Sequence, residues 1–227
     1  MTDFTVHGIP GSPFVRTVLL ALEEKGLPWH LAAIPIGAQR EPGYAAIHPF
    51  HKIPTLDHGD FRLYETIAIL GYLDRAAATN PLTPHDTRAR ARMDQLISIG
   101  LCYVTTTISA AISFPRRVAP LLGLQVDDSA VEGALPAAAA TLAEIARLLG
   151  DQPYMAGDAL SLADLMLVPH LAFLADYDEG RALLAGQPNV DAWRARMETR
   201  SSMAATEWDR LIALTGVDNK APVPVAA

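Results

Sequence analysis

Residues 48–73 read HPFHKIPTLDHGDFRLYETIAILGYL, and this stretch decides how the first half of the chain folds. Residues 55–58 and 60–63 are predicted strands of a β-hairpin, with Gly59 in the turn because glycine accepts a positive φ. A helix is predicted to begin near Glu65, since apolar residues follow at helical spacing and an acidic side chain suits the first turn. The stretch therefore predicts a loop, a hairpin and a helix in that order.

Pro54 stands immediately before the first of these strands. A proline there removes one backbone donor from the sheet, so the backbone groups of Ile53 stay free. If the Ile53–Pro54 bond is cis, which costs an X–Pro pair only about 0.5–1 kcal/mol, Ile53 can present both its N–H and its C=O to a peptide-like ligand. The alternative is an ordinary strand start with a trans proline, and these residues by themselves favour neither.

The residues before the hairpin predict a βαβ unit, with strands at 4–7 and 29–34. The helix between them is predicted to begin at Ser12-Pro13, because Ser is a preferred N-cap and Pro is preferred at the first helical position, and to stop at Gly26. Strand, helix and strand in this order give a parallel pair. Together with the hairpin and its helix, they predict an α/β thioredoxin-like domain over residues 1–77.

Residues 84–215 are predicted to form an all-α domain, after a linker at 76–81. A long helix is predicted from 86 to about 118, and Pro136 is expected to kink a later one. The Pro- and Ala-rich residues 220–227 are expected to be disordered. Three helix starts follow the capping-box pattern, with a Ser or Thr three positions before an acidic residue: Thr83 with Asp86, Ser129 with Glu132, and Ser161 with Asp164.

The composition is that of a globular protein, and it limits the classes of partner that the protein can bind. The net charge of −7 argues against a nucleic-acid partner, because phosphate binding needs clustered Lys and Arg. The single cysteine, Cys102, excludes an intrachain disulfide and is expected to be buried in an apolar helix. The N-terminal residues lack a secretory signal pattern, and no stretch approaches the about 20 apolar residues of a spanning helix, so a cytoplasmic location is expected.

Three sequence blocks, in order along the chain, resemble the cytosolic glutathione transferase family. KIPTL at 52–56 with the acidic helix start resembles the glutathione-binding half, HGIPGSPFVRTVLLALEEKGL at 7–27 resembles the opening strand and helix, and YMAGDALSLADL at 154–165 is similar to a helix start of the second domain. Within the family, the chain resembles bacterial, Ser-type members with a phi- or theta-like N-terminal domain. The resemblance implies conjugation of the glutathione thiolate to electrophilic small molecules, a detoxification role and a homodimer.

Ser12 is the candidate catalytic residue that this resemblance implies. A helix N-terminus favours an anion, so a thiol bound there has a lowered pKa, and a hydroxyl that donates to the thiolate stabilises it further. The alternative is a plain helix cap, which a Ser before a Pro also predicts, and both roles can coexist. Residues 1–40 contain neither Tyr nor Cys. The transferase classes with a catalytic Tyr are therefore excluded as models for this chain, and the absence of Cys argues against the classes with a catalytic Cys.

Glutathione carries two carboxylates and one ammonium, so its site needs charges of both signs. The resemblance implies that Glu65 pairs with the ammonium and that Thr66 donates to the γ-glutamyl carboxylate. Taken singly, these residues are also what an ordinary helix start or a solvated loop contains. The other implied glutathione-binding residues are Gln39, Arg40 and Lys52 at the glycine carboxylate, with Ile53 and Pro54 beside the peptide backbone.

Two positions depart from the family pattern. His51 stands where family members often carry Gly, in the run His-Pro-Phe-His that begins at His48, and Thr66 replaces the usual Ser. The substitution at 51 puts the shape of the ligand loop in doubt, whereas Thr66 keeps the hydroxyl. The two histidines have no accompanying ligand pattern, so we expect loop histidines and no metal site.

The electrophile is expected to bind between the domains, although the same residues could merely pack the helical bundle. The residues implied are Phe14, Tyr103, Thr107, Ile108, Ala111 and Phe114. Because one fold supports many reactions, two alternatives stay open. One is another glutathione-dependent enzyme, such as a peroxidase, isomerase, dehalogenase or ether-cleaving enzyme, and the other is a non-catalytic glutathione-binding or regulatory protein.

Overall fold

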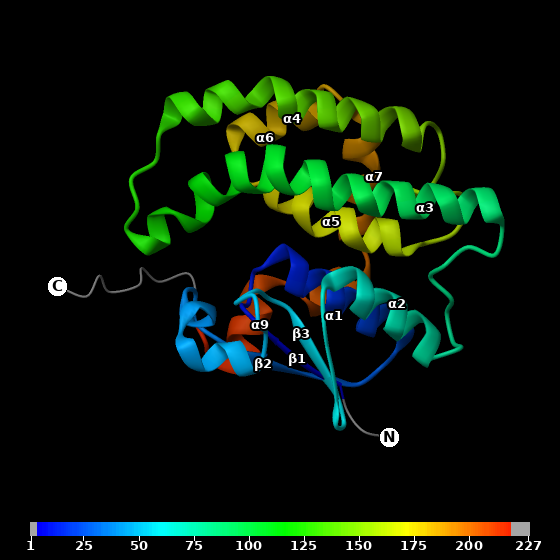
Figure 1. Cartoon of the computed structure of the whole chain (residues 1–227). Helices are drawn as coiled ribbons and strands as arrows, with labels where there is room; N and C mark the ends of the chain where they lie inside the picture. Colours follow the sequence, from blue (N-terminus) through cyan, green and yellow to red (C-terminus); the bar gives the residue numbers. More distant parts are fainter. Residues whose placement is uncertain (1–3, 219–227) are drawn as a thin grey trace. The chain divides into compact units, whose positions relative to one another are not determined.

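The structure, a computed structural model, describes residues 4–218, and the chain divides into two compact units (Figure 1). Unit 1 contains residues 4–81 and 200–218, and unit 2 contains residues 82–199. The expectation of disorder at 220–227 lies outside the described residues. We describe each unit by itself.

Unit 1 is an α/β unit built on a four-stranded sheet. The strand order is β2-β1-β3-β4, with β1 parallel to β2 and antiparallel to β3. The predicted βαβ unit and hairpin are both present, which confirms the thioredoxin-like fold class. The elements in chain order are β1 (Phe4–Gly8), α1 (Pro13–Lys25), β2 (Trp29–Ala33), η1 (Ala38–Arg40), η2 (Pro42–Ala46), β3 (Thr55–His58), β4 (Phe61–Tyr64), α2 (Thr66–Ala76), α8 (Ser201–Ala205) and α9 (Trp208–Thr215).

Helix α1 is the centre of this unit. Its buried face is apolar, and it packs against α2 and β1. The helix ends at Gly26, whose φ of 65° suits glycine and whose N–H bonds back to carbonyls of the last turn. Just before this end, the buried ammonium of Lys25 donates to Asp74 at 2.9 Å and to the carbonyls of Thr79 and Asn80 at 3.0 and 3.2 Å. These bonds fix the linker after α2 to the end of α1.

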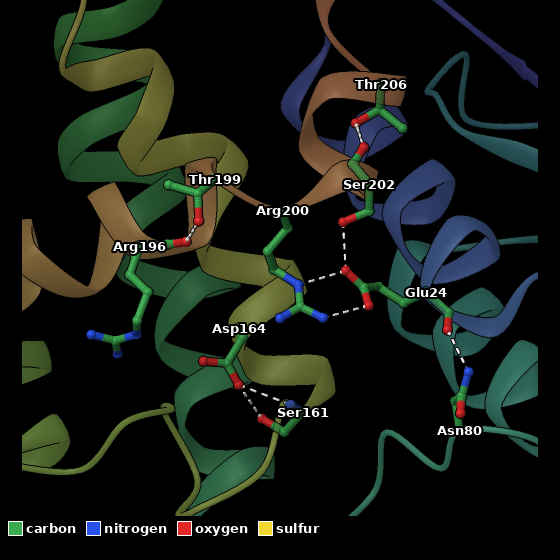
Figure 2. Close-up of polar contacts among 9 residues, drawn as sticks. All are labelled: Glu24, Asn80, Ser161, Asp164, Arg196, Thr199, Arg200, Ser202 and Thr206. Atoms are coloured by element: carbon green, nitrogen blue, oxygen red, sulfur yellow. Dashed lines mark hydrogen bonds and ion pairs between the residues drawn. The ribbon is translucent and has the colours of Figure 1, made fainter.

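The C-terminal helices α8 and α9 belong to this unit and not to the helical one. Figure 2 shows part of the attachment: Arg200 donates two hydrogen bonds of 2.7 Å to the carboxylate of Glu24 on α1, and Ser202 donates a third. Burial acts to raise the pKa of Glu24, but the bonds from Arg200 and Ser202 outweigh it, so the pKa is lowered. We expected residues 84–215 to form one domain, whereas residues 200–215 pack with the sheet unit. The limits 1–77 and 84–215 stay predictions about independent domains.

The regular elements of unit 2, residues 82–199, are all helices. Figure 1 shows α4 alongside α6, and α5 packs against η3, α3 and α7. The almost wholly apolar α5 is buried along nearly its entire length, as its sequence predicts. The elements in chain order are α3 (Thr87–Ile99), η3 (Gly100–Val118), η4 (Pro120–Leu122), α4 (Asp128–Leu149), α5 (Leu162–Leu174), α6 (Asp178–Ala185) and α7 (Pro188–Glu198).

The segment η3 is a π-helix of 19 residues, which the sequence did not predict. Bonds to the fifth preceding residue close its end, where Ala119 N–H donates to Phe114 at 2.9 Å. Most of its buried residues are spaced by four: Gly100, Val104, Ile108 and Ile112. Cys102 lies between two of them and is exposed, so the expectation that it is buried is wrong.

Helices α3 and η3 are continuous over Thr87–Val118, and this 32-residue segment is long and apolar enough to cross a membrane by length and composition. It corrects the expectation that no stretch approaches that length. It is weak support for a membrane span, because 44% of its most apolar window is buried inside the structure and the core helix of a soluble protein passes the same test.

Two of the three predicted capping boxes are displaced along the chain. Asp86 caps α3 by accepting from two N–H groups, and Asp127 caps α4, while Ser129 donates to Asp127. The box of Ser161 and Asp164 at α5 is confirmed. Pro136 lies inside α4 without ending it.

Candidate active site

The register of the sheet brings four chain segments to one edge. His7 of β1 lies opposite Thr55 of β3 in an antiparallel pair, so the end of β1 meets the start of β3. Thr55 also lies opposite Tyr64 at the end of β4, and β2 ends beside β1 because the two are parallel. The loops after β1, β2 and β4 therefore leave the sheet together with the loop before β3. They carry the predicted residues Ser12, Gln39, Arg40, Lys52, Ile53, Pro54, Glu65 and Thr66.

Ser12 is the N-cap of α1. Its Oγ accepts from the N–H of Val15 at 3.5 Å, which is long for a hydrogen bond. A hydroxyl has one donor and two acceptor positions, so Ser12 can cap the helix and still donate its proton elsewhere. Its half-buried side chain stands at the N-terminus of a 13-residue helix, where an anion such as a thiolate is favoured. The capping and catalytic roles are therefore compatible in one side chain.

The Ile53–Pro54 peptide bond is cis, so the trans alternative is wrong. Pro54 is buried and Ile53 is half-buried, while Lys52 is exposed. A cis X–Pro bond is a conserved feature of tight turns, and here it stands at the edge of the sheet where the four segments meet. Contact between Ile53 and a peptide-like ligand stays a prediction.

Glu65 has a backbone conformation that is rare for a residue with a side chain, with φ 71° and ψ 115°. Such conformations cost of order 1–3 kcal/mol and occur mostly at functional sites. The side chain of Glu65 is exposed and makes no capping bond to α2, so helix capping does not account for it. The next residue, Thr66, is 7% exposed at the first position of α2.

The loop after β2 is tied to the loop before β3. The carbonyl of Gln39 accepts from Nδ1 of His51 at 2.9 Å, and the side-chain Oε1 of Gln39 accepts from the N–H of Gly37 at 3.0 Å. The amide nitrogen of Gln39 therefore remains as its donor toward a carboxylate. Arg40 is exposed, and its guanidinium can bind a carboxylate with two parallel bonds.

Charges of both signs act on His48, which shows that these loops converge. Burial lowers the pKa of His48, the carboxylate of Glu65 acts to raise it, and Lys52 and His51 lower it further. Nδ1 of His48 accepts from the N–H of Phe50 at 3.2 Å, so this side chain supports its loop. Within residues 4–218, no cluster of three or more His, Cys, Asp or Glu side chains could hold a metal ion.

The predicted electrophile residues fall in both units, with Phe14 on α1 and the others on η3. Ile108 is fully buried, which favours packing within the bundle, and its contact with a ligand stays a prediction. The hydroxyl of Thr107 bonds to the carbonyl of Tyr103 at 2.8 Å and to the hydroxyl of Thr141 on α4 at 3.0 Å. Thr107 therefore joins η3 to α4.

Ala111 and Phe114 line a pocket of about 320 Å³ within unit 2. Its wall is mainly apolar and includes Ala110, Leu124 and Val131. Phe114 is 37% exposed, and Tyr103, which lies earlier on η3, is 58% exposed. These residues of η3 are accessible to a small molecule.

The sequence did not reveal the residues that brace the loop of Ser12. A Cβ atom on Gly11 would lie 2.3 Å from the ring of Trp208, so α9 packs directly on this loop. Arg16 donates to the carbonyl of Met203 at 2.8 Å and to the hydroxyl of Thr206 at 3.3 Å. Both contacts join residues far apart in the chain, and local patterns contain no signal for them.

The comparisons with known proteins agree with this architecture. Residues 11–76 match the glutathione S-transferase N-terminal domain, and residues 128–196 match the C-terminal domain. Human glutathione S-transferase theta-2B is 32% identical over 187 residues, which cover 81% of this chain and 75% of the relative. Poplar glutathione transferase F1 has a crystal structure with a TM-score of 0.83 at 26% identity, covering 93% of this chain and 99% of that one. A glutathione S-transferase-I structure with bound lactoylglutathione has a TM-score of 0.80 at 27% identity, covering 90% and 98%.

Fold and site together define a thioredoxin-like enzyme with a helical C-terminal part. The chain belongs to the cytosolic glutathione transferase family. The activity of this family is the transfer of glutathione, and the family uses glutathione as its substrate.

Proposed function

We propose that glutathione binds at the edge of the sheet where the four loops meet. Lys52 and Arg40 hold the glycine carboxylate, assisted by the amide nitrogen of Gln39. Ile53 pairs with the peptide backbone beside Pro54. The γ-glutamyl end lies at the start of α2, with its ammonium at Glu65 and its carboxylate at the hydroxyl and N–H of Thr66. The sheet register carries this proposal, because it gathers these residues from four separate segments.

Ser12 then activates the thiol. Its hydroxyl donates to the thiolate sulfur, and the N-terminus of α1 favours the negative charge. The thiolate attacks the electrophilic carbon of a small, mainly apolar molecule. We also propose that the protein is cytoplasmic, has a detoxification role and forms a homodimer. Sedimentation velocity tests the proposed dimer.

Calorimetric titration with glutathione tests the binding proposal. We expect saturable binding in the millimolar range or tighter, with a rise in Tm because a ligand that binds only the folded state stabilises it by mass action. A chromogenic aryl halide then tests conjugation by the appearance of the thioether. S-methylglutathione is the matched control, since it retains both carboxylates and the ammonium but has no thiol to transfer. Absence of glutathione binding would exclude the proposed site, and binding without conjugation would favour a non-catalytic protein.

A further inference from the structure

His51 occupies an unusual position in the proposed glutathione site. Its φ of 54° lies in the left-handed region, where residues other than Gly are uncommon, although His, Asn and Asp tolerate it best. It is half-buried and directly precedes Lys52. Its N–H donates to the carbonyl of His48 at 2.9 Å, and its ring reaches the carbonyl of Gln39 at 2.9 Å, 12 residues away in the chain. The residue therefore links the loop that carries Lys52 to the loop that carries Arg40.

The bond to Gln39 fixes the proton on the ring. A carbonyl oxygen can only accept, so Nδ1 of His51 must donate. In the neutral ring Nε2 then has a lone pair and cannot donate to a carboxylate. The ring is consequently suited to joining the loops through Nδ1, and less suited to binding an anion directly.

The loop on the other side of this bond is compact. The N–H of Arg40 bonds to the carbonyl of Gly37 at 2.9 Å, and the side chain of Gln39 folds back onto the N–H of the same Gly37. These internal bonds make the loop compact, and the bond from His51 joins it to the loop of Lys52. His51 therefore contributes to the position of Arg40 relative to Lys52.

We propose that His51 is a positioning residue for the glycine end of glutathione, which acts by holding the Arg40 loop against the Lys52 loop through Nδ1. The inference rests on the proposed function, because it assumes that these two cations hold the glycine carboxylate. It assigns a role to the residue that departs from the family pattern that the sequence resembles. It also makes the glycine part of the ligand, and not its γ-glutamyl part, the part that depends on residue 51.

Three substitutions distinguish the role of Nδ1 of His51 from that of Nε2. His51→Asn keeps a donor at the place of Nδ1 and tolerates the left-handed backbone. His51→Gln places its amide nitrogen near the position of Nε2 and loses the Nδ1 donor. His51→Gly removes both ends and also relieves the backbone, so we expect its Tm to lie within about 3 °C of wild type.

The experiment measures the affinity of each variant for glutathione and for γ-glutamylcysteine, which lacks the glycine. For His51→Gly and His51→Gln we expect glutathione affinity to fall about three- to tenfold, the usual effect of one lost hydrogen bond, with kcat at saturating glutathione almost unchanged. His51→Asn should bind glutathione as wild type does. Affinity for γ-glutamylcysteine should be the same in all four proteins.

Amide hydrogen exchange of residues 37–41 gives a readout that needs no ligand. We expect faster exchange in His51→Gly and His51→Gln, and wild-type exchange in His51→Asn. If exchange follows this pattern but the wild type does not bind glutathione, the loop link stands and the proposed function fails. The positioning role is overturned if His51→Gly binds glutathione with wild-type affinity. It is also overturned if His51→Asn binds glutathione as weakly as His51→Gly while His51→Gln binds with wild-type affinity. A third contrary result is an equal loss of affinity for glutathione and for γ-glutamylcysteine.

Discussion

Replacing Asp164 tests how much of the helical unit depends on one buried carboxylate. The side chain is 0% exposed at the start of α5. One oxygen accepts from the N–H of Met155 and from Nε1 of Trp193, both at 2.9 Å, and the other accepts from the N–H and the hydroxyl of Ser161 at 2.9 and 2.8 Å (Figure 2 shows the Ser161 bonds). Burial raises the pKa of Asp164, and these four donors act in the opposite direction.

The magnitude follows from what Asp164→Ala leaves behind. A simple helix cap is worth about 0.5–2 kcal/mol, but here the N–H groups of Met155 and Ser161 and the indole of Trp193 also lose their acceptor in a buried place. We therefore expect a loss of about 3–5 kcal/mol in the free energy of unfolding. Asp164→Asn should also be costly, because either orientation of the amide points its NH₂ group at two donors.

Urea denaturation at neutral pH measures the effect, and Asp158→Ala is the matched control, since Asp158 is an exposed acid in the same loop region. We expect the control to lie within about 0.5 kcal/mol of wild type. At a temperature where the variant is still folded, its turnover per folded molecule should be normal. A loss below about 1 kcal/mol, or lost turnover at unchanged stability, would refute this assignment.

Three further predictions concern the sheet unit. Ser12→Ala should raise the pKa of the bound glutathione thiol by about one to two units, because a charge-assisted hydrogen bond is worth about 1.5–3 kcal/mol. The free energy of unfolding should fall by only about 0.5 kcal/mol, since the cap bond is 3.5 Å long. If the thiolate absorbance of bound glutathione follows the same pH curve in the wild type and the variant, Ser12 is only a helix cap. Glu65→Gln should weaken glutathione binding by about tenfold or more at unchanged Tm, because the exposed carboxylate makes no cap bond; a lower Tm with normal affinity would make Glu65 structural. Arg62 and His7 hold the pKa of Asp57 down to about 2 against burial, from 3.8. The stability that Asp57 contributes, about 1–2 kcal/mol after allowance for partial exposure, should be present above pH 4 and disappear between about pH 4 and 2, so Asp57→Asn should flatten that part of the stability curve; an unchanged acid limb would contradict it.

Local chemistry explains which parts of the fold could be predicted. Gly59, Ser12-Pro13 and Gly26 act on their own backbone, and the elements they bound are where the sequence places them. The capping residues of α3 and α4 were displaced because an Asp two or three positions away competes for the same N–H groups, and Asp is as good a cap as Ser or Thr.

Non-local contacts explain the rest. The bonds of Arg200 to Glu24 span 176 residues, and periodicity contains no trace of such a pair. The same is true of Trp208 against Gly11. The buried Ile108 illustrates a related limit: a helical pattern says that a side chain faces something apolar, but not whether that is a ligand or the next helix. Within the candidate site, the family resemblance supplied the candidate residues, while their internal bonds, such as that of His51 to Gln39, came from the structure.

The return of α8 and α9 to the sheet unit has a consequence for how the chain is made. A ribosome releases residues in order at about 5–20 per second, so the helical part, residues 82–199, is complete before the sheet unit has its last two helices. Until residues 200–218 emerge, the carboxylate of Glu24 has no guanidinium and the loop of Ser12 has no indole against it. The sheet unit is therefore the first to be synthesised in part and the last to be completed. A premature stop near residue 199 would remove the contact of Trp208 with the loop of Ser12.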